Sequence, residues 1–187
     1  PNIKIEVLGP PPTSGTRDAF AELALEGGCK KFPFIKAMEK TEKKTFKKLC
    51  HTIREDGAYI EAGENDNLII SKLEENPKAL GVFGYSFLDQ NKNKIQGSIV
   101  EDNAPTFENI SSGKYPVSRS LYFYIKNAHV GKIPGISEYI AEFTSEKSFG
   151  TGGYLQEKGL IPSPDAERAE VRTNALDLSL AWLSDFN

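Results

Sequence analysis

The sequence predicts an α/β fold, in which short strands alternate with helices along the chain. Alternating apolar residues over 3–8 predict a strand, and the continuous apolar run over 79–84 is typical of a strand buried on both faces. Between them, residues 65–75 have the spacing of a helix, with a polar cap at the start and Asn76-Pro77 as the stop. Mixed elements in this order favour the α/β class.

The other expected elements follow in chain order. They are a helix over 17–25 closed by Gly27-Gly28, a polar helix over 33–49, a turn at Asp56-Gly57, a weak strand over 95–100, a short helix over 106–112, a helix starting near Pro134, and a helix from Asp165 to Leu183. At the end of the last segment, the alternation of Leu176, Leu178 and Leu180 leaves a strand as the alternative. The clearest long strand is predicted over 115–125, because its odd positions form one apolar face.

Length and composition indicate a folded protein. The chain has 187 residues, of which 39% are hydrophobic and 26% charged, which excludes a disordered chain or a collagen-like fibre. No apolar run approaches the ~18–20 residues that cross a bilayer, and no signal-peptide pattern is found at the start. The only methionine is Met38, so a start residue was removed or the chain begins inside a longer one.

The charge is unevenly distributed. The formal net charge is −3, and the isoelectric point near 5.6 argues against a nucleic-acid-binding protein. Between Cys29 and Cys50, however, eight lysines face only two glutamates, a net charge of about +6. This segment is either a solvated helical face, which the pattern favours, or a patch for an anionic surface or partner.

Cys29 and Cys50 bracket the lysine-rich segment and are candidates for a disulfide, with a buried reduced pair as the alternative. A bond closing a loop of this size would contribute ~3 kcal/mol to stability and would imply an oxidising compartment. The sequence has no Cys-x-x-Cys motif and no Cys–His cluster, so no metal site is expected. His51 and His129 match no catalytic signature, and we expect no enzyme activity, no catalytic residue and no cofactor.

The strongest candidate site is Ser14-Gly15-Thr16-Arg17, which opens a helix directly after a strand and a run of prolines. Free N–H groups at a helix N-terminus attract anions, and a glycine permits close approach of the backbone. The hydroxyls add donors, and Arg17 offers a forked pair to a tetrahedral oxyanion. The alternative is that Ser14 or Thr13 simply caps the helix. The spacing does not match a P-loop.

Five stretches resemble a known family in the same order along the chain: 9–20, 57–67, 79–85, 115–119, and 152–154 with 159–162. Together they resemble the PstS-type periplasmic phosphate-binding proteins of ABC transporters over nearly the whole chain. The Ser-Gly-Thr motif alone is weak evidence, whereas the ordered set is strong.

The resemblance implies a type II periplasmic-binding-protein-like fold, with one nearly complete lobe over 1–112 and the C-terminal part of the other over 113–187. It implies a periplasmic solute-binding component of an ABC importer that holds inorganic phosphate between its lobes, with a membrane permease as partner and no nucleic acid. The phosphate would contact Ser14, Gly15, Thr16 and Arg17. The alternative is a truncated, non-transporting interaction or structural module that has lost tight phosphate binding.

The chain departs from the family in two ways. Many members carry an arginine and an aspartate just upstream of Ser-Gly-Thr, where Pro10 and Pro12 stand here. The sequence therefore does not identify the carboxylate that accepts the phosphate proton. Asp18 and Asp56 are the candidates for it, and Arg54 is a weaker candidate for a cationic contact. The strand and turn that begin the family's first lobe are missing, so the chain resembles a C-terminal part, to which an N-terminal segment or a second chain would add the rest.

Overall fold

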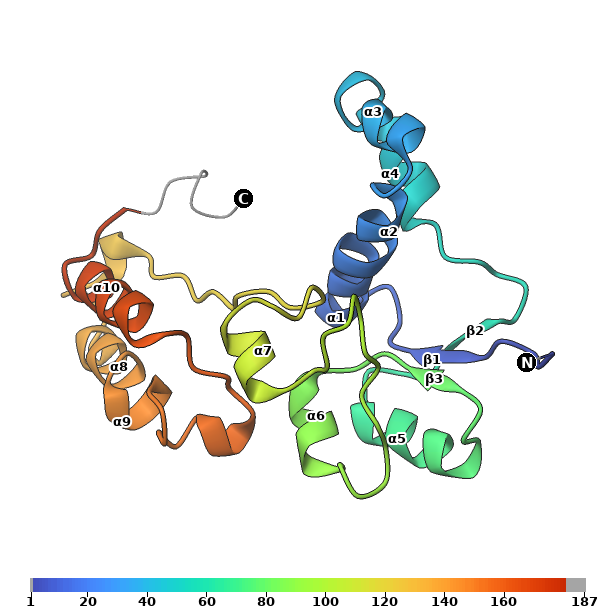
Figure 1. Ribbon diagram of the computed structural model, residues 1–187. Helices are drawn as coiled ribbons and strands as arrows, with labels where there is room; N and C mark the ends of the chain where they lie inside the picture. The colour runs from blue at the N-terminus through green and yellow to red at the C-terminus, as the bar shows by residue number, and fades with distance from the viewer. Residues whose placement is uncertain (1, 181–187) are drawn as a thin grey trace. The chain divides into compact units, whose positions relative to one another are not determined.

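The computed structural model describes residues 2–180, which form two compact units (Figure 1). The first unit extends to Pro105 and includes Tyr115–Arg119, and the second comprises Thr106–Lys114 and the residues from Ser120 onward. The assignment of 1–112 and 113–187 to two different lobes stays a prediction. Within the described residues, none of the helices is both long and apolar enough to cross a bilayer.

The first unit is built on a parallel three-stranded sheet. Strands β1 (Val7–Gly9), β2 (Tyr59–Glu61) and β3 (Leu80–Gly81) lie in the order β2-β1-β3. In the central strand, Leu8 faces Ile60 on one side and Gly81 on the other, and its side chain is buried. Parallel neighbours require crossover connections, which helices supply here. The α/β prediction is confirmed.

Helix α5 (Asp66–Glu75) supplies most of the apolar cover for this sheet. Ile69 and Ala62 are buried against Leu8, and Leu73 and Phe83 pack around them. The Asn65 side chain accepts a hydrogen bond from the Asn67 N–H, which is the cap that the sequence predicts. This core holds the β1 end in place, where the candidate site begins.

A continuous helical segment follows the loop after β1. It consists of α1 (Gly15–Ala19), a π-helical stretch η1 (Phe20–Glu26) and α2 (Gly27–Cys29). The predicted stop at Gly27-Gly28 is wrong, because Gly27 keeps helical angles of φ −55° and ψ −45°. The helix therefore extends to the first cysteine.

Residues 30–51 form a helical hairpin, here called the arm, which projects beyond α2 (Figure 1). Its helices are α3 (Pro33–Thr41) and α4 (Lys43–His51). The single predicted helix is split at Glu42, whose φ of −139° and ψ of 52° are not helical. A disulfide joins Cys29 to Cys50 with their Cα atoms 5.9 Å apart, which confirms the predicted bond.

The base of the arm is also tied to the first helix by charged groups. Glu26 Oε2 lies 2.5 Å from His51 Nε2, and Lys30 Nζ lies 2.8 Å from both Glu26 Oε1 and Glu39 Oε1. Burial raises the pKa of Glu26, but the hydrogen bonds from Lys30 and His51 outweigh it and lower that pKa below its ordinary 4.5.

We expect Glu26→Gln to lower the free energy of unfolding by about 1.5 kcal/mol at neutral pH, because charge-assisted hydrogen bonds are lost. A carboxyl whose pKa is lowered by folding stabilises fully above its unfolded value and loses that contribution as pH falls through the folded value. The difference from wild type should therefore be constant above about pH 5 and shrink below about pH 4.5. Urea unfolding across pH measures it, with Glu75→Gln as the control; a difference that grows on acidification would contradict the assignment.

Two predicted strands do not form. Over 95–100, only Val100 takes part in a bridge, with Asn103. Over 115–125, no strand is formed, and within residues 2–180 no other segment pairs with it. The alternation is visible in burial only at the end of this stretch, where Phe123 and Ile125 are half-buried and Tyr124 is 75% exposed. Leu121, which the pattern places on the apolar face, is 79% exposed. Periodicity reports which side chains face a core, but a strand also needs a hydrogen-bonding neighbour.

The rest of the first unit is α6 (Tyr85–Gln90) with irregular chain, and the described part of the second unit is helical. Its elements are α7 (Phe107–Ser111), η2 (Asn127–His129), α8 (Ile136–Phe143), α9 (Glu146–Phe149), η3 (Gln156–Lys158) and α10 (Asp165–Leu176). The last predicted helix ends earlier than expected, and its predicted portion over 181–183 lies outside the described residues.

One buried arginine, paired with an exposed glutamate, organises the second unit. Arg168 of α10 is only 5% exposed, and its Nη2 lies 2.8 Å from Glu146 Oε2 at the start of α9. Arg172, one turn further along α10, donates to the Ala141 carbonyl oxygen of α8 at 3.0 Å. These contacts fix α10 against α8 and α9.

Candidate functional site

Three loops leave the carboxyl ends of the parallel strands in the first unit. They are residues 10–14 after β1, 62–65 after β2 and 82–84 after β3. In α/β sheets ligands bind at this edge, next to the strand from which the connections diverge to opposite sides. Here that strand is the central β1, because β2 and β3 lie on either side of it.

Ser14 ends the β1 loop and begins the helix. Its extended backbone (φ −88°, ψ 131°) allows its Oγ to accept from the Thr16 N–H at 3.2 Å. The capping role considered from the sequence is therefore present. Gly15 and Thr16 follow as the first helical residues, and Gly15 is exposed. An anion at this place would meet the open N-terminal end of a helical segment that runs on to Cys29.

The guanidinium group of Arg17 is held by other residues of the protein and is not free to bind a ligand. Its Nη1 donates to the Pro10 carbonyl oxygen at 3.1 Å and lies 3.7 Å from Glu61 Oε1, while its guanidinium lies 4.5 Å from the centre of the Tyr59 ring. The side chain is only 16% exposed. In this arrangement Arg17 braces the proline loop against β2.

Tyr59 completes this brace. Its hydroxyl donates to the same Pro10 carbonyl oxygen at 3.0 Å, and burial raises the pKa of that hydroxyl, so it stays a donor. Gly9 makes the approach possible, because a Cβ there would lie 2.1 Å from Tyr59 Oη. The loop therefore has a fixed shape before any ligand arrives.

Arg119 is a site residue that sequence reasoning missed. Its Nη2 donates to the Gly15 carbonyl oxygen at 3.2 Å, its Nη1 lies 3.9 Å from Glu22 Oε2, and its side chain is 45% exposed. The segment 115–119 contributed to the family resemblance, but no role for Arg119 followed. Its distance of 104 residues from Gly15 in the sequence hides the contact.

The β2 loop brings a carboxylate to the same place. Thr13 Oγ1 donates to Glu64 Oε1 at 2.6 Å. Asp66, two residues on, faces the β3 loop instead: its Oδ2 accepts from the Gly84 N–H at 3.4 Å, and burial raises its pKa. Glu64 is exposed and is therefore the carboxylate of these two that solvent and a ligand can reach.

Three weaker candidates lie apart from this arrangement or on its edge. Arg54 Nε donates to Asp56 Oδ1 at 2.8 Å, and Asp56 also accepts from the Ala58 N–H at 3.2 Å. The Arg54 hydrogen bond and the Ala58 N–H lower the pKa of Asp56. The described hydrogen bonds of this pair stabilise the turn before β2, and none of them reaches the Ser14 loop. Asp18 is exposed in the first turn of α1.

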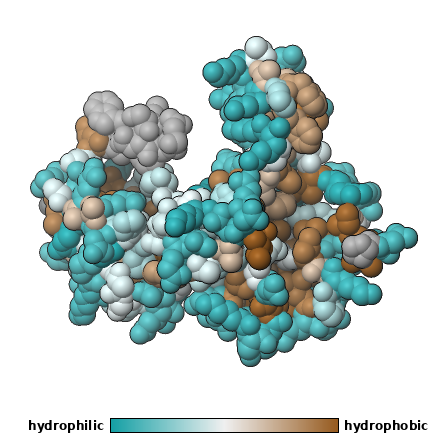
Figure 2. Space-filling model, viewed as in Figure 1, coloured by the Kyte–Doolittle hydropathy of each residue, from teal (hydrophilic) through white to brown (hydrophobic). Residues whose placement is uncertain are grey.

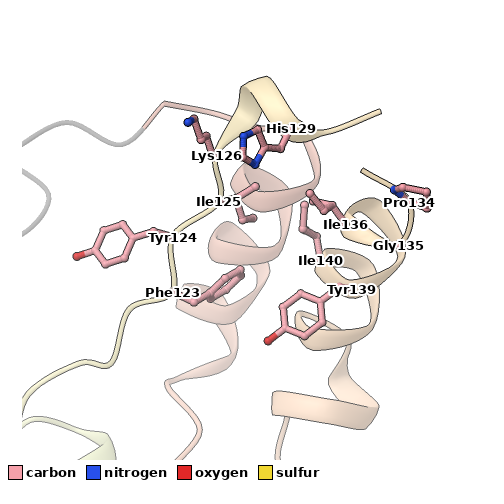
Figure 3. Close-up of a pocket in the computed structure, with 10 residues that line it drawn as sticks. All are labelled: Phe123, Tyr124, Ile125, Lys126, His129, Pro134, Gly135, Ile136, Tyr139 and Ile140. Atoms are coloured by element: carbon pink, nitrogen blue, oxygen red, sulfur yellow. The ribbon is translucent and has the colours of Figure 1, made fainter. Parts of the chain in front are cut away.

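A separate hollow of about 400 Å³ lies in the second unit (Figure 3). Phe123 and Ile125 point toward α8, whereas Tyr124 points away, and Tyr139 and Ile140 close the other wall. Phe123 packs edge-on against Phe143 with ring centres 4.6 Å apart. The lining of the hollow is largely apolar, and Lys126 and His129 are the main groups there that could bind an oxyanion.

The family model described as "PBP superfamily domain" matches residues 1–147. The chain belongs to the PBP superfamily. Two curated relatives are named "Phosphate-binding protein PstS". That of Staphylococcus haemolyticus is 27% identical over 170 residues, with 88% of this chain and 44% of the relative covered. That of Staphylococcus saprophyticus is 24% identical over 183 residues, with 95% of this chain and 47% of the relative covered.

A solved structure is also similar over most of the length of this chain. The crystal structure of "a possible phosphate binding protein" from Planctomyces limnophilus matches with a TM-score of 0.59 and 25% identity, covering 96% of this chain and 56% of that one. The resemblance to PstS-type proteins and the periplasmic-binding-protein-like α/β fold are therefore confirmed. The chain spans about half the length of the curated relatives it matches.

Proposed function

We propose that the chain binds inorganic phosphate as the solute-binding component of an ABC phosphate importer. The observation that carries this is the Ser14–Arg17 loop, placed at the carboxyl edge of a parallel sheet in a member of the PBP superfamily. The relatives' names support phosphate as the ligand, and they do not favour a non-transporting module. This role would place the chain in the periplasm, with a membrane permease as partner and no enzyme activity.

The neutral donors to phosphate would come from the backbone and side chains of one short loop. The N–H group of Gly15, the hydroxyls of Ser14 and Thr16, and the positive end of the helix would surround the oxyanion, while the Thr16 N–H donates to the Ser14 cap. A net charge of −3 does not attract an anion, so binding depends on these local donors.

The two arginines have different roles in this proposal. Arg119 is half-exposed and sits over Gly15, so its guanidinium is the available charge for the ligand. Arg17 is held by Pro10, Tyr59 and Glu61 and keeps the loop in shape. Arg17 remains part of the proposed site, but for direct contact with phosphate its side chain would have to leave this brace.

Glu64 is the best-placed acceptor for the phosphate proton. Phosphate carries a proton near neutral pH and sulfate does not, so a carboxylate in the site favours phosphate. Glu64 touches Thr13 beside the loop, whereas Asp56 is bonded to Arg54 and Ala58. Asp18 is the second candidate, because it lies in the first turn of α1.

Calorimetric titration with phosphate and with sulfate tests the proposal. Wild type should bind phosphate more tightly than sulfate, and Arg119→Ala should weaken phosphate about tenfold to hundredfold, because a charged donor is worth ~1.5–3 kcal/mol. Arg54→Ala is the matched control, since it removes an exposed arginine whose hydrogen bonds stay within its own turn. Equal affinities for the two anions, or equal losses in both variants, would contradict the site.

A further inference from the structure

The arm carries a set of unpaired positive charges that the phosphate loop does not use. Lys30 and Lys31 pair with carboxylates, at 2.8 Å to Glu26 and 2.6 Å to Glu101. The other six lysines of the arm are exposed, and among the described residues no carboxylate lies within ion-pair distance of them: Lys36, Lys40, Lys43, Lys44, Lys47 and Lys48.

These lysines are arranged in rows along the two helices. Lys43, Lys44, Lys47 and Lys48 follow one another at the spacing that places side chains on one side of α4. The adjoining side of α4 supplies Phe46 and Cys50, which are 1% and 3% exposed. The charged side therefore faces solvent and the apolar side closes the hairpin.

Beside the charges, the arm exposes a pair of aromatic rings. Phe32 is 53% exposed and Phe34 is 71% exposed, and their ring centres lie 6.1 Å apart at the start of α3. Neither ring contributes to the buried core of the arm, which is formed by Phe46 and the disulfide. Figure 2 shows hydrophilic and hydrophobic atoms side by side on this projection.

We infer that the arm is a docking surface for an anionic phospholipid bilayer. Lysine stems would carry their charges to the headgroups while Phe32 and Phe34 enter the boundary between headgroups and acyl chains. Two weak signals, a basic cluster and a small apolar anchor, act together in reversible membrane binding. The disulfide and the Glu26 cluster keep both signals on one rigid projection.

The composition favours lipid over the other anionic partners. The arm has six free lysines but no arginine, tyrosine or tryptophan, whereas protein interfaces are depleted in lysine and enriched in those three. A lysine is a point charge on a flexible stem, which suits a fluid layer of headgroups better than one fixed acceptor. Nucleic-acid-binding domains are usually basic overall, and this chain has an isoelectric point near 5.6.

Co-sedimentation of the chain with vesicles tests this inference. The chain should bind phosphatidylcholine vesicles that contain phosphatidylglycerol, and bind pure phosphatidylcholine at least about tenfold more weakly. Replacing Lys43, Lys44, Lys47 and Lys48 by glutamine should weaken binding at least about tenfold, and about 0.5 M salt should abolish it. Phe34→Ser, which leaves every charge in place, should weaken binding about threefold or more.

The control removes the same charge elsewhere: Lys78, Lys114, Lys132 and Lys158, all exposed, become glutamine. Circular dichroism and phosphate titration should show all variants folded and equal to wild type. Failure of wild type to bind the anionic vesicles, an equal loss in the control, or binding to a single-stranded oligonucleotide without vesicle binding would overturn the inference. None of these outcomes depends on whether the Ser14 loop binds phosphate.

Discussion

Replacing Cys29 and Cys50 together by serine should lower the free energy of unfolding by about 3 kcal/mol. The two cysteines are 21 residues apart, and the bond closes the arm at its base. Opening it frees a loop of this length in the unfolded state, which is the main source of the stabilisation. The arm has little else to replace the bond, because its fully buried apolar side chain is Phe46.

Urea unfolding of wild type and variant, each with and without a reductant, measures this effect. Reductant should destabilise wild type by a similar amount and leave the serine variant unchanged, so that the variant serves as the control for the reagent. If reductant left wild type unchanged, the bond would contribute nothing to stability. The carboxylate contacts at the base of the arm survive in either case, so the variant should keep part of the hairpin.

Local signals were sufficient for much of the fold. The Asn65 cap, the position of the short strand at Leu80–Gly81 and the cysteine pair depend on residues close together in the sequence. That strand is not buried on both faces as predicted, because it lies at the edge of the sheet and Leu80 is 56% exposed. The prediction of a strand over 115–125 was wrong because a strand depends on residues far away in the sequence. The alternation in this segment matches burial only over residues 122–125, and a strand exists only when a neighbouring strand shares its hydrogen bonds, which is a tertiary property.

The same distinction between local and distant contacts applies to the candidate site. The Ser14–Arg17 loop is contiguous, so its capping geometry follows from sequence. Arg119 and Glu64 come to it from segments 104 and 51 residues away, and only the packed structure brings them together. The fixed position of Arg17 could not be predicted from the sequence either, because it depends on Tyr59 in strand β2 and on the absence of a side chain at Gly9.

Replacing Glu64 by glutamine should reduce the preference for phosphate over sulfate by about a hundredfold, since two like charges placed together cost several kcal/mol. In the proposed site, the Glu64 carboxylate beside Thr13 would accept a hydrogen bond from protonated phosphate but would face sulfate with a second negative charge. A glutamine amide can donate to sulfate, which removes the repulsion. The phosphate affinity should fall and the sulfate affinity should rise, and competition titration of the two anions gives the ratio directly.

Glu61→Gln is the matched control for this variant. Glu61 is also an exposed carboxylate on β2, but it lies 3.7 Å from Arg17 Nη1 and is no hydrogen-bond partner of Thr13. It should alter the brace without altering the anion preference, since Pro10 and Tyr59 still hold Arg17. An unchanged ratio in Glu64→Gln would move the proton-accepting role to another carboxyl group, for which Asp18 in the first turn of α1 is the next candidate. A changed ratio in both variants would show instead that the preference follows the total negative charge at this edge of the sheet.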